Sequence, residues 1–151
     1  AYLNHEFTNF KDGNCYNTQA DPEGDGLCDY TGLTGGYAPK KTINLGFDYT
    51  QHLSDGLTLR ASIDGQYIDK QNVNANLDPQ YTIDANTNLD ARIGLESESW
   101  TVALLGKNLT DEKILSFATN VPLSGSLFAT DTFSGFVAPP RSVAIEGNYR
   151  F

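Results

Sequence analysis

The chain has 151 residues, of which 39% are hydrophobic and 11% aromatic, and its net charge is −9. This length provides for one domain, and so many aromatic residues with only 19% charged residues exclude a disordered segment. The excess of 19 acidic over 10 basic residues disfavours a nucleic acid as partner. No apolar run is longer than 102–105, which excludes a membrane-spanning helix of about 20 residues but leaves a transmembrane β-barrel open.

Residues 1–10 have no methionine, no cationic start and no apolar core, so they do not form a signal peptide. Their partial alternation of apolar and polar residues predicts a weak first strand. Either a leader has been removed or the chain is a piece of a longer polypeptide, and we expect the second.

The only cysteines are Cys15 and Cys28, which lie in a stretch rich in Gly, Asn and Asp without other thiols or histidines nearby. A four-ligand zinc site cannot be assembled there, so we favour a disulfide over free thiols. Closing a loop of this length contributes about 3 kcal/mol in the chain-entropy model. A disulfide also indicates an oxidising periplasmic or extracellular setting.

Acidic residues alternate between the cysteines, at Asp21, Glu23 and Asp25, as they do at the start of a calcium-binding loop. The twelfth position, where such a loop needs a bidentate acid, is Gly32. We therefore favour a solvated acidic loop held by the disulfide, with calcium as the weaker alternative, and we expect no cofactor.

Strict alternation of apolar and polar residues predicts a β-hairpin made of strands 41–53 and 57–69. The odd positions of both segments are mostly apolar, and the even positions are mostly polar. The connection between them ends in Gly56, which suits a hairpin with a bulge. Pairing Leu53 with Leu57 satisfies both the short turn and the two apolar faces, so both signals predict the same register.

A second hairpin is predicted from strands 85–96 and 99–109, with a turn at 97–98, and a last strand follows at 141–151. With the weak strand at 1–10, the total is about six strands and no helix. The predicted fold is therefore all-β, an antiparallel up-and-down meander.

Long segments connect the strands at 11–40, 70–84 and 110–140, whereas the other turns span a few residues. In a meander all the long loops then lie at one end, as in outer-membrane barrels, and strands of about 11 residues are long enough to cross a bilayer. Alternation also suits a soluble barrel or sandwich with its apolar face inside, so that architecture remains an alternative.

The segment from 113 to 140 carries four phenylalanines among Gly, Ser and Thr, and these are Phe117, Phe128, Phe133 and Phe136. Such a loop has the composition to contact an amphipathic ligand from outside. We favour the simpler interpretation that the rings pack the loop onto its neighbours.

Two motifs near the C-terminus indicate a family. The stretch 106–113 reads GKNLTDEK, and the last strand opens with Pro140-Arg141 and ends with Tyr149 and Phe151. This arrangement resembles the end of the TonB-dependent receptors, in which Asn-Leu-Thr-Asp leaves the penultimate strand and a long external loop leads to Pro-Arg. Paired cysteines in an external loop also resemble one branch of these receptors.

The resemblance implies that residues 1–151 are the C-terminal portion of a barrel of the 22-stranded type in the bacterial outer membrane. It implies an active transporter that takes up a ferric siderophore or another scarce nutrient. The implied partners are outer-membrane lipid, the rest of the barrel and its plug, the TonB energy-coupling complex, and the barrel-assembly machinery, which would recognise Tyr149 and Phe151. The alternatives are a passive porin-like channel and a soluble barrel that binds a small ligand.

No enzymatic activity is expected. The only histidines are His5 and His52, and the chain contains no GxSxG, metal-binding histidine pair or phosphate loop. Asp48 and Arg60 are near neighbours in the predicted register, and we expect them to stabilise the sheet. The glycosylation sequence that starts at Asn108 is interpreted as part of the receptor motif.

Overall fold

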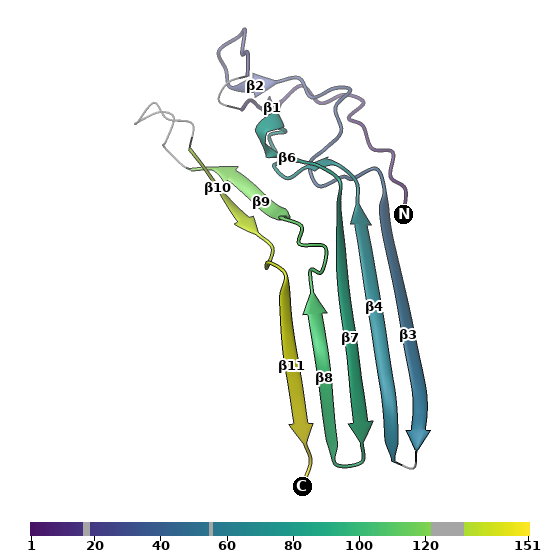
Figure 1. Cartoon of the computed structure of the whole chain (residues 1–151). Helices are drawn as coiled ribbons and strands as arrows, with labels where there is room; N and C mark the ends of the chain where they lie inside the picture. The colour runs from purple at the N-terminus through teal and green to yellow at the C-terminus, as the bar shows by residue number, and fades with distance from the viewer. Residues whose placement is uncertain (17–18, 55, 122–131) are drawn as a thin grey trace. The chain divides into compact units, whose positions relative to one another are not determined.

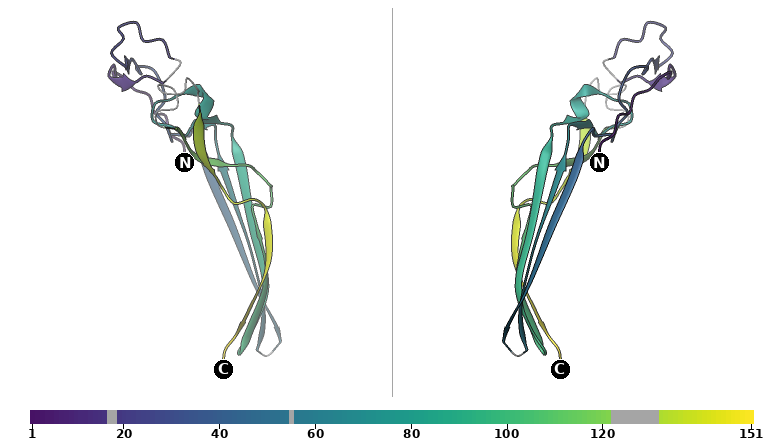
Figure 2. Two further views of the ribbon diagram at one scale, coloured as in Figure 1. Left: turned by 90° about the vertical axis from the view of Figure 1, so that its left-hand side faces the viewer. Right: turned by 90° about the vertical axis from the view of Figure 1, so that its right-hand side faces the viewer.

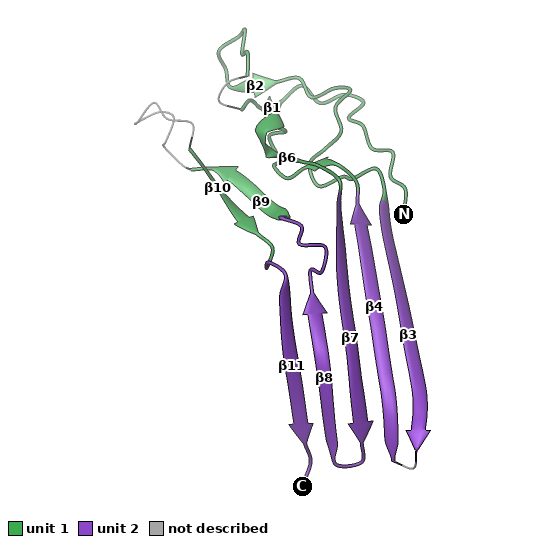
Figure 3. Ribbon diagram, in the orientation of Figure 1, with its two compact units in different colours: residues 1–41, 69–85, 114–138 green, residues 42–68, 86–113, 139–151 purple. Residues whose placement is uncertain are grey.

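The computed structural model describes residues 1–16, 19–54, 56–121 and 132–151 (Figure 1; Figure 2). The fold is all-β with antiparallel pairing, which confirms the predicted fold class. The chain divides into two compact units (Figure 3). Unit 1 contains residues 1–41, 69–85 and 114–138, and unit 2 contains residues 42–68, 86–113 and 139–151.

Unit 2 is a five-stranded antiparallel sheet of order β11-β8-β7-β4-β3, in which each strand pairs with the next one along the chain. The predicted up-and-down meander is therefore confirmed. The five strands form a single twisted layer (Figure 2), and the short turns β3–β4 and β7–β8 lie at the same end of it (Figure 1). The strands are β3 (Thr42–Ser54), β4 (Leu57–Ile68), β7 (Asn86–Ser97), β8 (Trp100–Lys107) and β11 (Ser142–Tyr149).

The register of the first hairpin agrees with the sequence pattern except beside the turn. Phe47 lies opposite Ile63, as the apolar faces require. The expected pairing of Leu53 with Leu57 is wrong by one residue, because Leu57 pairs with Ser54 and the ladder shifts between His52 and Ser54. A bulge at this point absorbs the extra residue, so the face of every other side chain is preserved.

Unit 1 contains short hairpins inside the segments that were expected to be loops. Local pairing of this kind is too short to produce a period-2 pattern, so alternation did not reveal it. The elements are β1 (Gly13–Asn14) with β2 (Leu27–Cys28), β5 (Gln71–Asn72) with β6 (Thr82–Ile83), the 3-10 helix η1 (Pro79–Tyr81), and β9 (Leu115–Asn120) with β10 (Phe133–Val137).

The core of unit 1 consists of Val73, Tyr81 and Ala118, against which Ile83 and Leu115 pack. The Tyr81 side chain is fully buried, and its hydroxyl is 2.7 Å from the Asn120 side-chain oxygen, so its polar end is satisfied inside the core. This core joins the segment 69–85 to the β9–β10 hairpin.

A run of side-chain turns orders the approach to η1. The backbone N–H groups of Asn74, Asn76 and Asp78 each donate to the side-chain oxygen of the residue two positions earlier. The Asp78 carboxylate accepts in turn from the N–H of Gln80 and so caps η1. Asn and Asp side chains readily form such turns, and the alternating Asn72-x-Asn-x-Asn-x-Asp sequence was the signal that sequence reasoning missed.

The strand expected at residues 1–10 is not formed. Among these residues only Tyr2 makes a β-bridge, with Lys41. The physical reason is that neither the odd nor the even positions provide a continuous apolar face. Phe7 and Phe10 instead contact the ring of Tyr30, at centroid distances of 6.4 and 5.5 Å.

Candidate functional site

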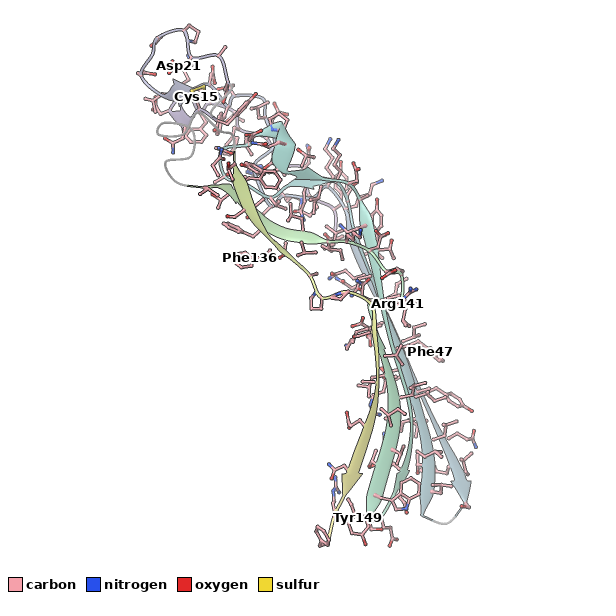
Figure 4. All side chains as sticks on the ribbon, turned by 60° about the vertical axis from the view of Figure 1, so that its left-hand side comes forward. Cys15, Asp21, Phe47, Phe136, Arg141 and Tyr149 are labelled. Carbon is pink, nitrogen blue, oxygen red and sulfur yellow. A yellow bond between two sulfur atoms is a disulfide. The ribbon has the colours of Figure 1, made fainter. Side chains whose placement is uncertain are left out.

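One face of the unit 2 sheet, which we call the apolar face, is made of large hydrophobic side chains that are 36 to 79% exposed. Phe47, for example, projects away from its strand (Figure 4). No charged residue of the five strands lies on this face. Its exposed members are Ile43, Leu45, Phe47, Tyr49, Ile63, Ile93, Leu95, Val102, Leu104, Val143, Ile145 and Tyr149.

The opposite face, the polar face, carries all the strand charges. Three ion pairs connect different strands there, two between neighbouring strands and one from β7 to β11 across β8, with N to O distances of 2.6 to 3.7 Å. These exposed pairs contribute little individually, typically below about 1 kcal/mol, but they place unlike charges side by side. They are Arg60 with Glu96, Lys107 with Asp90, and Arg92 with Glu146.

The expected neighbours Asp48 and Arg60 do not form an ion pair. Asp48 lies opposite Ser62, whereas Arg60 Nε is 2.6 Å from Glu96 Oε2 on the next strand. Arg60 pairs across the ladder with Gly94, which has no side chain, so the guanidinium has room to reach Glu96. Pairing with β7 therefore decided the partner of Arg60.

This division of the sheet bears on the environment of each face. A soluble barrel or sandwich buries its apolar face, and exposed apolar patches of this extent are rare on soluble monomers. Within the described residues, no helix has both the length and the apolar character to cross a membrane.

The Asn-Leu-Thr-Asp motif forms a clamp at the end of β8. Asn108 is 7% exposed, and its side-chain amide donates to the carbonyl oxygens of Glu112 at 2.9 Å and of Pro139 at 3.2 Å. Its side-chain oxygen accepts from the Glu112 N–H at 3.1 Å. The Asn108 backbone N–H donates to Asp90 Oδ1 at 2.9 Å. With both ends of its amide bonded, Asn108 is unsuited to glycosylation.

The motif also contacts the first residues of the last strand. Asp111 Oδ2 is 3.2 Å from a guanidinium nitrogen of Arg141, which precedes β11 (Figure 4). The Leu109 N–H donates to the Leu89 carbonyl at 2.7 Å. Residues that are 30 positions apart in the chain are thereby held together where β8 ends and β11 begins.

Replacing Asn108 with alanine should lower the free energy of unfolding by about 1–3 kcal/mol, because buried carbonyl and N–H groups lose their partner. The positive φ of 48° at Asn108 adds strain for alanine but none for glycine. Denaturant titrations of both variants separate the two effects. If Asn108→Gly unfolds like the wild type, the side-chain bonds contribute nothing.

The two residues expected to form the assembly signal lie at the end of the chain. Tyr149 and Phe151 are both exposed, and their rings meet edge to face with centroids 5.2 Å apart. Tyr149 pairs with Trp100 across the β8–β11 ladder. The role of this pair in assembly stays a prediction.

The predicted disulfide is confirmed. Cys15 and Cys28 are bonded, with their Cα atoms 5.2 Å apart. The bond lies beside the two-residue hairpin in which Gly13 pairs with Cys28. Figure 4 labels Cys15 and Asp21, which belong to the same loop.

The acidic residues expected as a weak calcium candidate have other contacts. Both oxygens of Asp21 accept backbone N–H groups, from Gly24 and Gly26, each at 2.8 Å. Asp25 accepts from the N–H of Leu27. A calcium site here would need Glu23 as a third ligand beside Asp21 and Asp25. Among the described residues, no group of three His, Cys, Asp or Glu side chains is arranged to hold a metal ion. The Asp21 carboxylate therefore caps backbone N–H groups of its own loop.

These two hydrogen bonds, from Gly26 and Gly24 in that order, lower the pKa of Asp21 below its ordinary value of 3.8. A carboxyl group with a lowered folded pKa contributes stability that is complete above pH 3.8 and is lost as the pH falls through the folded pKa. We expect the amide shifts of Gly24 and Gly26 to titrate below pH 3.8 in NMR spectra, and Asp21→Asn to remove that transition. A transition unchanged in Asp21→Asn would contradict the assignment.

The phenylalanines of the 110–140 segment divide into two groups. The Phe133 side chain is 56% exposed, but its ring lies 6.0 Å from that of the core residue Tyr81, a contact of the kind expected for a loop held to its neighbours. Phe117 and Phe136 pair across the β9–β10 ladder with rings 6.0 Å apart, and both are exposed. Phe128 lies outside the described residues.

Comparisons with models of protein families, with curated proteins and with solved structures gave no match. The function of the chain is therefore inferred from its own residues.

Proposed function

We propose that this chain is a C-terminal barrel segment of a TonB-dependent transporter in the bacterial outer membrane. The observation that carries the proposal is the apolar face, which extends over five paired strands while every strand charge lies on the opposite face. A sheet with lipid on one side and water on the other needs this division. We therefore assign the apolar face to lipid and the polar face to the wall of a wet interior.

Strand length supports the same assignment. β3 has 13 residues, and β4 and β7 have 12 each, which exceeds the 9–11 residues that a tilted strand needs to cross the hydrocarbon core, whereas β8 and β11 have 8 each. Unpaired backbone groups are costly in lipid, so the outer edges of β3 and β11 would pair with further strands of a closed barrel. The remainder of the barrel is thus the first partner that the proposal requires.

The transport activity rests on the receptor-like motifs. The hydrogen bonds of Asn108 and the ion pair of Asp111 with Arg141 hold the motif residues against the start of β11. We assign to the whole receptor the uptake of a ferric siderophore or another scarce nutrient, driven through its plug by the TonB complex. This segment supplies barrel wall and external loops and performs no catalysis.

A pair of tryptophan reporters tests the lipid assignment. Trp100 is the single tryptophan, so Trp100→Phe gives a blank background for Ile63→Trp and its neighbour Ser62→Trp, which lie on opposite faces of β4. In vesicles, lipids brominated on their acyl chains should strongly quench the fluorescence of the Ile63→Trp variant and only weakly quench that of the Ser62→Trp variant. Equal quenching in both variants, or a folded monodisperse chain in plain buffer, would refute it.

Energy dependence tests the transport assignment. In cells that make the receptor, uptake of siderophore-bound iron should stop when the proton gradient of the inner membrane is collapsed. Uptake that continues under those conditions would instead identify a passive channel.

A further inference from the structure

Two tyrosine side chains connect two separate segments of unit 1, residues 1–41 and 69–85. The Tyr30 hydroxyl donates to the carbonyl oxygen of Asn76, at 2.8 Å. The Tyr37 hydroxyl donates to the carbonyl oxygen of Val73, at 2.6 Å. Both donors belong to the segment with the cysteines, and both acceptors belong to the other segment.

The backbones of the two segments also meet closely between these bonds. The Tyr37 N–H donates to the Asn72 carbonyl at 2.8 Å. At Gly36, a Cβ atom would lie 2.5 Å from the carbonyl oxygen of Asn74, so a larger residue would force the backbones apart. The contact is therefore continuous rather than two isolated side-chain bonds.

The acceptor side of this contact is ordered in advance. Its carbonyl groups lie within the run of side-chain turns from Asn72 to Asp78. The Val73 side chain is 1% exposed, and its N–H donates to the Tyr81 carbonyl at 2.9 Å. Acceptors fixed in this way lose little entropy when a hydroxyl group binds to them.

The donor side depends on the disulfide. Tyr30 is 2% exposed, and its ring lies so close to Gly13 that a Cβ there would be 2.7 Å away. Its single hydroxyl proton is shared between the carbonyl oxygens of Asn14 in β1 and Asn76 in the other segment. Gly13 and Asn14 form β1, which the Cys15–Cys28 bond holds against β2. Burial raises the pKa of Tyr30, so the hydroxyl keeps the proton that it donates.

We propose that Tyr30 and Tyr37 form a latch that transmits the redox state of the Cys15–Cys28 bond to residues 72–78. A dithiol reductant would cleave the S–S bond, give two thiols and itself become a disulfide. β1 would then separate from β2, Tyr30 would lose the pocket made by Gly13 and Asn14, and the second segment would loosen with the first. Oxidised and reduced chains thus differ in the order of both segments.

Hydrogen–deuterium exchange of the full chain tests the latch. The probes are the amides of Val73, Asn74, Asn76 and Asp78, whose hydrogen bonds belong to the second segment. On reduction with dithiothreitol we expect these amides to exchange about tenfold faster, which corresponds to about 1.4 kcal/mol. Amides of the β4–β7 ladder should not change, and this result does not depend on whether that sheet lies in a membrane.

Conservative variants distinguish the latch from general loosening. The double variant Tyr30→Phe with Tyr37→Phe keeps both rings and removes only the hydroxyls, and it should accelerate exchange at the same amides without reductant. Tyr2→Phe is the matched control, because Tyr2 lies in the same segment 1–41 and its side chain is exposed. The latch is refuted if reduction accelerates only residues 13–28, or if the double variant exchanges like Tyr2→Phe.

Discussion

Ile63→Arg should destabilise the chain in a bilayer by about 2–4 kcal/mol, the cost of arginine at the midplane of a lipid-facing strand. Ile63 is 41% exposed on the apolar face and lies in β4, with Phe47 opposite on one side and Ala91 on the other. A guanidinium group there is surrounded by apolar side chains and, in the proposed setting, by acyl chains. The free energy of unfolding of the closed barrel in lipid vesicles, measured by denaturant titration, checks the effect.

Ser62→Arg provides the matched control for this experiment. Ser62 is adjacent in sequence but lies on the polar face, between Asp48 and Arg92 on the neighbouring strands. An arginine at this position faces one unlike and one like charge in water, so the change should stay within about 0.5 kcal/mol. If both variants lose the same stability, the apolar face does not lie in lipid.

Removing the disulfide should have the largest effect in unit 1. The Cys15→Ser, Cys28→Ser double variant frees a loop with a sequence separation of 13, which the chain-entropy model values at about 3 kcal/mol. Thermal unfolding of the double variant, compared with the oxidised wild type, should show an earlier loss of structure in unit 1. The five-stranded sheet, which contains no cysteine, should retain its own transition.

Chemical reduction is the internal control for that prediction. Adding a reductant to the wild type should reproduce the behaviour of the double variant, and adding it to the double variant should change nothing. If the double variant unfolds with the oxidised wild type, the Asp21 hydrogen bonds to Gly24 and Gly26 are sufficient to hold the loop.

The five strands of unit 2 were predictable because they depend on a local property. Side chains in a strand alternate between its two faces, so the sequence from Thr42 to Ile68 already shows which residues share a face. The short turn then limits the register to within one residue, and the bulge beside Ser54 is the only departure in that hairpin. The disulfide was equally accessible, because no other thiol competes for either cysteine.

The structure of unit 1 was much less predictable. The β9–β10 hairpin contains no long alternation, and it is held by contacts with a distant segment. Phe133 packs on Tyr81, and the Asn74 side chain donates to the Ala118 carbonyl, 44 residues away. At residues 1–10 the alternation was misleading, because it predicted a strand that is not formed. Among these residues only Tyr2 makes a β-bridge, and that bridge is isolated.

Three contacts could not be predicted from the sequence. Arg60 bonds to Glu96 rather than to Asp48, Asn108 reaches Pro139, and Tyr30 reaches Asn76. Each joins residues that are 31 to 46 positions apart. The sequence by itself determined which residues of each long strand share a face, because that depends only on the two-residue period of the backbone. Only the tertiary structure decided which side chains from different segments meet, because that depends on how distant parts of the chain pair and pack.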